Sequence, residues 1–121
     1  MIKFKSLNQS KEFLKILKKK RLNTKYFTIF FDRNSKNSRK GFNKYLNISF
    51  VIKKKVGNSV TRNKIKRRLK AAVQKILNEK QTIDLNYTYI VIGKNNAYKD
   101  KFSSIFNEAS NVFRTIKKIE S

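Results

Sequence analysis

The side chains of this chain that could take part in binding or catalysis are overwhelmingly cationic. Its 121 residues include 31 lysines and arginines against seven aspartates and glutamates, a formal charge of +24. Nine of the cations fall in residues 53–70, KKKVGNSVTRNKIKRRLK, which hold no acid. A compact protein tolerates such self-repulsion best when a polyanion neutralises it, so we expect nucleic acid as the partner. A generally basic protein without such a partner is the alternative.

Residues that could catalyse a reaction are few and dispersed. The chain has no histidine and no cysteine, which removes imidazole bases, thiol nucleophiles, disulfides and the usual zinc ligands. The seven acids are separated along the sequence: Glu12, Asp32, Glu79, Asp84, Asp100, Glu108 and Glu120. So few carboxylates do not favour a metal-dependent nuclease site. We therefore expect no catalytic residue and no metal ligand in the protein itself.

Apolar segments that could enter a membrane are short. No apolar run approaches the roughly 20 residues that cross a bilayer, and the first residues lack the apolar core of a signal peptide. We therefore expect a cytoplasmic protein with no membrane partner.

The apolar content predicts one folded domain over residues 1–121. Hydrophobic residues make up 39% of the chain and include ten phenylalanines and five tyrosines, too many for a disordered basic tail. Periodicity predicts helices over residues 8–20, after Gly57-Asn58, and over 102–119, with strands over 26–31, 45–52 and 86–92. Residues 32–41 are polar without periodicity, which indicates a loop.

The basic helix after Gly57-Asn58 divides into two faces at about 100° per residue. An apolar stripe should pack on the sheet: Ile65, Leu69, Ala72, Val73 and Ile76. Opposite it lie Asn63, Arg67, Lys70 and Gln74, with Lys64 and Lys66 on the flanks. Arg62 falls near the stripe, where its stem can lie on the sheet edge while the guanidinium reaches out. Because no acid stands at i±4, the cationic face favours a binding surface over an ordinary solvated one.

Aromatic residues near the N-terminus leave two interpretations open. In the strand over 26–31, Phe27, Ile29 and Phe31 should face the core, whereas Tyr26 and Phe30 share the other face. That pair could stack on nucleic-acid bases or could be covered by a helix. The stripe of the first helix, Phe13, Ile16 and Leu17, is favoured as core on pattern alone. In the last strand, Ile90 and Ile92 are expected to face the core.

The segment from Lys54 to Lys70 resembles the protein subunit of bacterial ribonuclease P. That family has a Lys-Lys-hydrophobic-Gly-Asn turn, an Arg-Asn-Arg motif and a basic Ile-Lys-Arg run. The motif here reads Arg62-Asn63-Lys64, so lysine replaces the third residue and loses the bidentate geometry of arginine. The resemblance implies an α/β fold, a single-domain α-β sandwich in the order α-β-β-β-α-β-α. It also implies a left-handed crossover at the basic helix, against the right-handed norm.

The same resemblance implies the function of a protein subunit that supports maturation of the tRNA 5′ end. Phosphodiester hydrolysis would then belong to the catalytic RNA subunit and its Mg²⁺, with precursor tRNA as substrate. Contacts to the RNA subunit are expected from Lys54, Lys55, Arg62, Asn63, Lys64, Lys66, Arg67, Arg68 and Lys70. A cleft for the single-stranded 5′ leader is expected from Phe13, Leu17 and Phe30, with Tyr26 nearby. Leu17 stands where the family commonly has an aromatic residue.

Two other functions fit parts of the sequence. A ribosomal protein or another structural RNA-binding protein would carry the same charge and could dock the same helix on folded RNA. A cationic protein acting on anionic membranes would need an amphipathic helix, and the long one is residues 102–119, whose wide apolar stripe is needed by the core.

Overall fold

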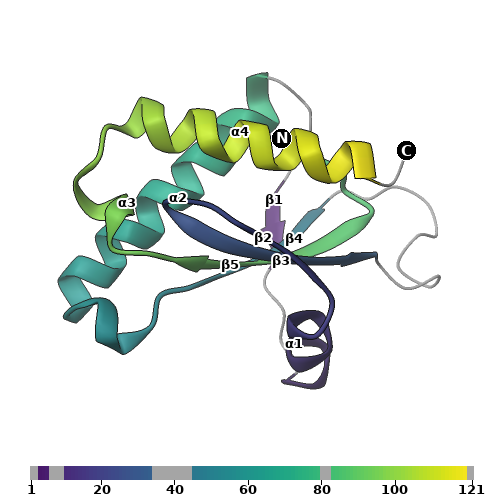
Figure 1. Ribbon diagram of the computed structural model, residues 1–121, viewed down its shortest axis with the longest axis horizontal. Coiled ribbons are helices and arrows are strands. Elements are labelled where there is room, and N and C mark those ends of the chain that lie inside the picture. The colour runs from purple at the N-terminus through teal and green to yellow at the C-terminus, as the bar shows by residue number, and fades with distance from the viewer. Residues whose placement is uncertain (1–2, 6–9, 34–44, 80–82, 120–121) are drawn as a thin grey trace.

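The computed structural model describes residues 3–5, 10–33, 45–79 and 83–119. Its elements are β1 (Lys3–Lys5), α1 (Ser10–Leu17), β2 (Lys20–Asn23), β3 (Phe27–Arg33), β4 (Tyr45–Val51), the 3-10 turn η2 (Lys54–Val56), α2 (Ser59–Glu79), β5 (Tyr87–Gly93), α3 (Asn96–Lys99) and α4 (Phe102–Ile119) (Figure 1). The predicted order is confirmed by α1-β2-β3-β4-α2-β5-α4, to which the structure adds β1 and α3. The loop predicted over 32–41 is wrong for its first two residues, because β3 continues to Arg33; the rest of the predicted loop lies outside the described residues.

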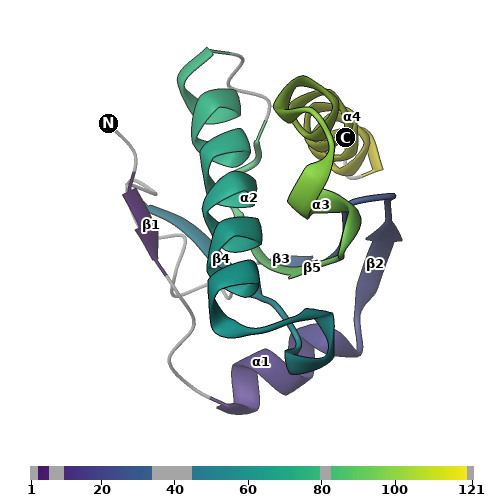
Figure 2. The same ribbon diagram turned by 90° about the vertical axis from the view of Figure 1, so that its left-hand side faces the viewer.

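The strands form one sheet in the order β1-β4-β5-β3-β2. The central strand β5 pairs in parallel with β4 and antiparallel with β3. Since α2 connects the parallel neighbours β4 and β5, it is the crossover helix; its left-handed sense stays an expectation from the resemblance. Helices α2 and α4 lie on one face of the sheet and α1 on the other, as both views show (Figures 1 and 2).

The main core fills the space between the sheet and the pair α2 and α4. The predicted inward face of β3 is confirmed, since Phe27, Ile29 and Phe31 are at most 2% exposed. On β4, alternate residues are likewise buried in this core or packed against it: Leu46, Ile48, Phe50 and Ile52. All five residues of the predicted α2 stripe are buried there, together with Leu77. Most of the α4 stripe is buried too, although Ile119 remains 46% exposed.

The expected orientation of β5 is wrong with respect to this main core. Tyr87, Tyr89 and Val91 face it, whereas Ile90 packs in a separate cluster on the α1 face, with Ile92 against it. In the antiparallel register Ile90 lies opposite Phe30, so the two side chains share a face. Apolar residues on both faces of β5 left its sequence without the alternation that would have oriented it.

Gly93 ends β5 at a place where α2 passes close to the sheet. A Cβ added there would overlap the Ile52 Cδ1 methyl and lie 3.0 Å from both Ile65 Cγ2 and Leu69 Cδ1. Those last two side chains belong to the buried stripe of α2. The missing side chain of Gly93 therefore sets how closely the first turns of α2 can approach β5.

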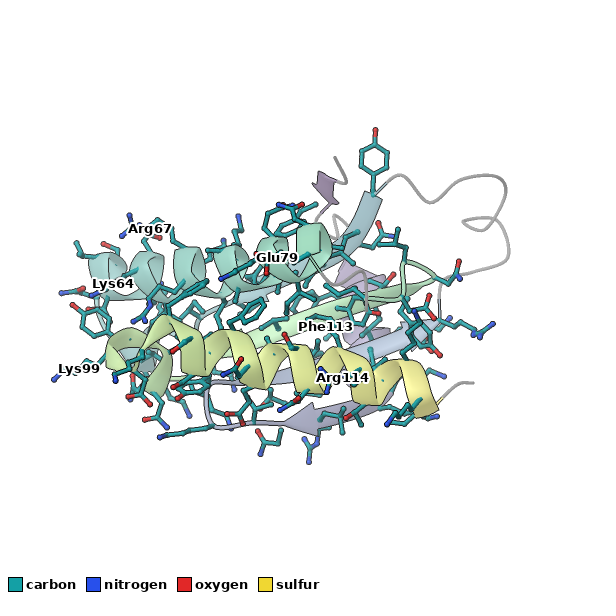
Figure 3. The ribbon with its side chains drawn as sticks, turned by 90° about the horizontal axis from the view of Figure 1, so that it is seen from above. Lys64, Arg67, Glu79, Lys99, Phe113 and Arg114 are labelled. Atoms are coloured by element: carbon teal, nitrogen blue, oxygen red, sulfur yellow. The ribbon has the colours of Figure 1, made fainter. Side chains whose placement is uncertain are left out.

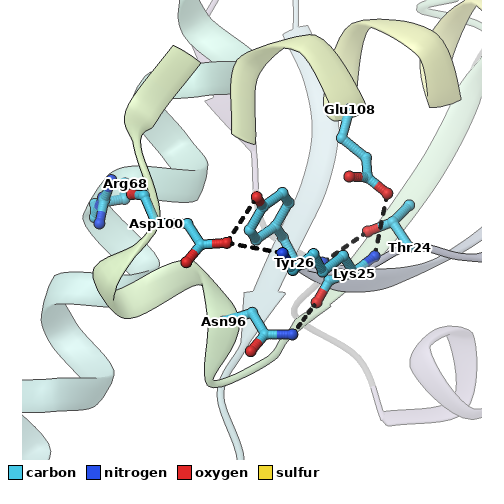
Figure 4. Close-up of polar contacts among 7 residues, drawn as sticks. All are labelled: Thr24, Lys25, Tyr26, Arg68, Asn96, Asp100 and Glu108. Carbon is cyan, nitrogen blue, oxygen red and sulfur yellow. Dashed lines mark hydrogen bonds and ion pairs between the residues drawn. The ribbon is translucent and has the colours of Figure 1, made fainter. Parts of the chain in front are cut away.

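A polar corner fixes α2 and α3 to the turn between β2 and β3 (Figure 4). The Tyr26 hydroxyl donates to Asp100 Oδ2 at 2.9 Å, and Lys25 Nζ lies 3.2 Å from the same oxygen. From α2, Arg68 Nη1 donates to the Tyr98 carbonyl at 2.7 Å and Nη2 donates to the Asp100 carbonyl. The backbone of Lys25 is held as well, its amide by Glu108 Oε1 at 3.1 Å and its carbonyl by Asn96 Nδ2 at 3.1 Å.

These contacts shift the pKa values of Asp100, Lys25 and Tyr26, and all three shifts favour the same protonation states. Hydrogen bonds from Tyr26 and then Lys25 hold the pKa of Asp100 below its ordinary value of 3.8. The bond to Asp100 raises the pKa of Lys25 above 10.5, and burial of the ring followed by the same bond raises the pKa of Tyr26 above 10.0. The corner is therefore most favourable when Asp100 is ionised and both partners are protonated.

We predict that Gly93→Ala lowers the free energy of unfolding by about 1–3 kcal/mol, because the added methyl group must push α2 away from β5. Urea denaturation followed by circular dichroism measures this change. Arg67→Ala, an exposed substitution in the same helix, is the control and should change stability by no more than about 0.5 kcal/mol. Equal stability of Gly93→Ala and the wild type would contradict the close approach.

We predict that Asp100→Asn destabilises the protein near neutral pH and that this difference shrinks in acid. Because the folded pKa of Asp100 is lowered, its contribution is present above its ordinary value of 3.8 and is lost as pH falls through the folded value. Urea titrations of wild type and variant from about pH 7 down to about pH 2.5 span this window. A difference in stability that does not change with pH would count against the ionised corner.

Candidate nucleic-acid interface

The entrance to α2 is a capped turn that exposes three consecutive lysines. Strand β4 ends at Val51, and the Lys53 carbonyl accepts the amide of Val56 at 3.0 Å as η2 closes. Asn58 then caps α2: its Oδ1 accepts the Thr61 amide at 2.9 Å, and its carbonyl begins the helical bonds. Lys53, Lys54 and Lys55 are all exposed. The Gly-Asn pair therefore joins an exposed cationic turn directly to the start of α2.

The outer face of α2 is exposed and cationic, as predicted. Asn63, Arg67 and Lys70 are exposed, and Lys64 and Lys66 are half-buried on the flanks. Figure 3 shows Lys64 and Arg67 along the first half of α2, with the helix's one acid, Glu79, at its far end. Within the ranges that the structure describes, no cation of α2 forms an ion pair. The charges on the outer face and its flanks, those of Lys64, Lys66, Arg67 and Lys70, are therefore available to an external anion.

Two arginines of α2 are turned away from this outer face. Arg62 is half-buried near the apolar stripe, as predicted, and its Nε is buried without a hydrogen-bond acceptor among the described residues. Arg68 donates to the carbonyls of Tyr98 and Asp100. Sequence position alone grouped Arg68 with the RNA-contacting cations, but two of its guanidinium nitrogens are used inside the protein.

Aromatic rings of neighbouring elements lie beneath three lysines of α2. Lys64 Nζ is 4.4 Å from the centroid of the Tyr98 ring, a cation-π distance. Lys75 Nζ lies 4.8 Å from the Phe106 ring and Lys70 Nζ lies 6.0 Å from the Phe50 ring. These contacts restrict long side chains that would otherwise be free to rotate.

The α1 face carries a second, smaller apolar cluster. Ile16, Phe30 and Ile90 are buried in it, and Phe13 and Leu17 pack against it half-buried. Phe30 lies on the predicted face but is only 8% exposed, because α1 covers it. The structure thus brings Phe13, Leu17 and Phe30 together, with the two α1 residues partly accessible.

Tyr26 does not join this cluster, contrary to expectation. It is 3% exposed, packs in the main core and bonds to Asp100. The reason is that β3 begins at Phe27, so Tyr26 belongs to a turn in which its amide donates to Thr24 Oγ1 at 3.1 Å. Its ring therefore cannot offer a stacking surface on the α1 face.

A pocket of about 290 Å³ connects the α1 face to the cationic turn. It is lined by Thr28, Lys53, Lys55, Val56, Ile92, Gly93, Lys94 and Asn95. Ile92 also packs against the Phe30 cluster, so this residue is shared by the pocket and the cluster. Lys94, whose Nζ donates to the Thr24 carbonyl at 2.6 Å, was missed by sequence reasoning. The parallel pairing of β4 and β5 brings the residues that follow both strands to one edge of the sheet. The place of Lys94 next to the cationic turn depends on that pairing and is not visible in the sequence.

A larger pocket of about 500 Å³ lies elsewhere, between β2 and α4. Its lining contains no lysine or arginine: Leu22, Asn23, Thr24, Ser104, Asn107, Glu108, Asn111, Val112 and Thr115. For a polyanionic ligand, the smaller pocket next to Lys53 and Lys55 has the matching chemistry.

The described ranges lack the features of two other kinds of site. No group of three or more acidic, histidine or cysteine side chains is placed to hold a metal ion among these residues. In the same part of the chain, no helix combines the length and the apolar character needed to cross a membrane.

Comparison with known proteins identifies the family. The sequence model of the family described as Ribonuclease P matches residues 1–117. A ribonuclease P protein component from Mesoplasma florum is 30% identical over 102 residues, which cover 81% of this chain and 82% of that protein. Another, from Mesomycoplasma hyopneumoniae strain 7448, is 28% identical over 121 residues, 99% of each chain.

Solved structures show the same fold. The RNase P protein of Thermotoga maritima superposes with a TM-score of 0.67 at 22% identity, covering 92% of this chain and 96% of that one. The RNase P protein of Staphylococcus aureus gives a TM-score of 0.67 at 24% identity, covering 93% and 94%. With a family match over nearly the whole sequence and this shared fold, the chain belongs to the ribonuclease P protein family.

Proposed function

We propose that this protein, a subunit of ribonuclease P, docks on the catalytic RNA through the outer face of α2 and holds the 5′ leader of precursor tRNA on the α1 face. The observation that carries the proposal is the outer face of α2, where exposed cations have no acidic partner within the described residues. Free cations at a capped helix start neutralise phosphates and release counterions. The ribosomal alternative predicts the same charge but lacks the support of the family match.

The surface for the RNA subunit consists of the η2 lysines and the outward part of α2. Its members are Lys54, Lys55, Asn63, Lys64, Lys66, Arg67 and Lys70, with Arg62 at the edge. Arg68 does not belong to this surface; it supports the surface by holding the backbone of α3 through its hydrogen bond to the Tyr98 carbonyl. Because these side chains come from one helix and the turn before it, the backbone positions from which they project are set before RNA binds.

The leader path begins at Phe13 and Leu17 and continues along the pocket lined by Thr28 and Ile92 toward Lys53, Lys55 and Lys94. Apolar side chains can receive base faces of any sequence, and the lysines can neutralise the leader's phosphates. A single strand with exposed bases suits this path better than a duplex, whose bases are stacked inside.

The chemistry of leader removal is assigned to the RNA subunit and to Mg²⁺ held by it. The chain supplies no histidine or cysteine and only seven carboxylates, so its own residues bind and orient the substrate while the RNA activates the attacking water. Precursor tRNA and the catalytic RNA would be met in the cytoplasm, where we place the protein.

We predict that the protein strongly stimulates leader removal by its cognate ribonuclease P RNA at low Mg²⁺, and that Arg67→Ala requires about tenfold more protein for half-maximal stimulation, as expected for a lost charged hydrogen bond. The slope of log K against log salt should fall by about 0.7–0.9 for that variant. Lys117→Ala, which removes one exposed charge from α4, is the matched control and should behave as wild type.

A wild-type protein that leaves the RNA reaction unchanged, as a ribosomal protein would, overturns the proposed function. Cleavage of precursor tRNA by the protein in Mg²⁺ without any RNA subunit would overturn the division of labour instead.

We predict that Phe13→Ala weakens holoenzyme binding of precursor tRNA with a long leader by about 1–3 kcal/mol, the range for loss of one base-aromatic contact. Mature tRNA without a leader should bind unchanged. Leu14→Ala, an exposed neighbour at 58% exposure, controls for effects on α1, and unfolding curves check that both variants stay folded. Equal losses for precursor and mature tRNA would refute the leader path. Phe13 is the better probe than Phe30, whose truncation would leave a cavity.

A further inference from the structure

Lys64 is the third residue of the Arg62-Asn63-Lys64 motif and is the place where this chain departs from the family's arginine. A lysine has a flexible four-carbon stem and a point charge, so it usually loses more rotational freedom than arginine when it binds phosphate. Lys64 is half-buried at the flank of α2, not free on its outer face. The surroundings of its ammonium group therefore decide how well lysine can serve at this position.

The ring of Tyr98 lies under that ammonium group. Lys64 Nζ is 4.4 Å from the ring centroid, the shortest such separation among the described cation-aromatic pairs. Tyr98 is half-buried in α3, and its side chain is held by packing against the main core. In Figure 3 the side chains of Lys64 and of Lys99, the residue after Tyr98, lie at the same end of the molecule.

Tyr98 is in turn held by α2 itself. Arg68 follows Lys64 by one helical turn, so the two side chains leave the same side of the helix. Arg68 Nη1 donates to the Tyr98 carbonyl at 2.7 Å, and Nη2 donates to the carbonyl of Asp100. The Asp100 side chain is anchored to Tyr26. Arg68 thus fixes the backbone of Tyr98, and the ring of Tyr98 restricts Lys64.

We propose that Tyr98 is a positioning residue for RNA binding: its ring holds the Lys64 ammonium in place at the start of α2, so that a lysine presents a fixed charge at the motif's third position. The inference rests on the proposed docking of α2 on RNA. Arg68 contributes to RNA binding through Tyr98 and not by touching RNA.

The test measures binding of the full-length protein to its cognate ribonuclease P RNA. The variants are Tyr98→Leu, Tyr98→Phe, Lys64→Met, the double variant Tyr98→Leu/Lys64→Met, and Lys75→Met. Tyr98→Phe is the matched control because it keeps the ring, and Lys75→Met removes another ring-contacting lysine of α2 outside the proposed surface. Unfolding curves accompany every variant.

Tyr98→Leu is expected to weaken binding about two- to fivefold, the range for an exposed cation-π contact, whereas Tyr98→Phe stays within about twofold of wild type. Lys64→Met should weaken binding further and lower the salt slope by about 0.7–0.9. In the Lys64→Met background, Tyr98→Leu should have no further effect. Lys75→Met should match wild type.

An equal effect of Tyr98→Leu with and without Lys64 would overturn the proposal, because the ring would then act by packing or by touching RNA directly. So would unchanged binding of Tyr98→Leu. If Tyr98→Leu does not fold, NMR of the free wild-type protein provides the test. The ring should shift the ε-methylene protons of Lys64 upfield, and Tyr98→Phe should show the same shift. Unshifted protons would overturn the contact. Failure of the wild type to bind the RNA would instead refute the proposed function.

Discussion

Packing of a narrow apolar stripe of α2 against the sheet is the interaction on which the rest of the structure depends. Ile65, Leu69 and Ile76 are each at most 2% exposed, and burial of such a side chain contributes about 1.5–3 kcal/mol. That contribution must offset the repulsion among lysines and arginines on the opposite side of the same helix. Gly93 makes the contact close, and the Asn58 cap fixes where the helix begins. The hydrophobic packing of one side of α2 therefore determines the direction in which its cationic side faces.

Features governed by short-range periodicity were predictable from the sequence. The stripe of α2, the inward face of β3 and the full extent of α4 follow from spacing along one element, and the structure confirms them. The short strand β1 and the four-residue α3 were not predicted, and β2 was expected only from the order of elements in the family, because KFK, NAYK and KRLN are too short to show a period. Their places are decided by neighbours in space.

Parts of the candidate site that depend on pairing between distant segments could not be predicted. Lys94 joins Lys53 and Lys55 only because β4 and β5 run in parallel and end at one edge. Tyr26 was assigned to the wrong face because a strand starting one residue later removes it from the alternation. Arg68 looked equivalent to Arg67, yet the carbonyls that accept its hydrogen bonds lie 30 and 32 residues further along the chain. In each case the deciding contact is long-range.

The central position of β5 has a consequence for how the protein is made. β3 and β4 do not pair with each other; each pairs with β5, which is residues 87–93. β3 also pairs with β2, and β4 with β1, so the earlier strands form two separate pairs. During synthesis from the N-terminus, the strand that joins these two pairs is missing until about three-quarters of the 121 residues have been made. Such non-local pairing is slow to form because long loops must close first. The α2 surface and the α1 face therefore become ordered together and late, so the nascent chain carries its full basic segment before it has a fold to present it on.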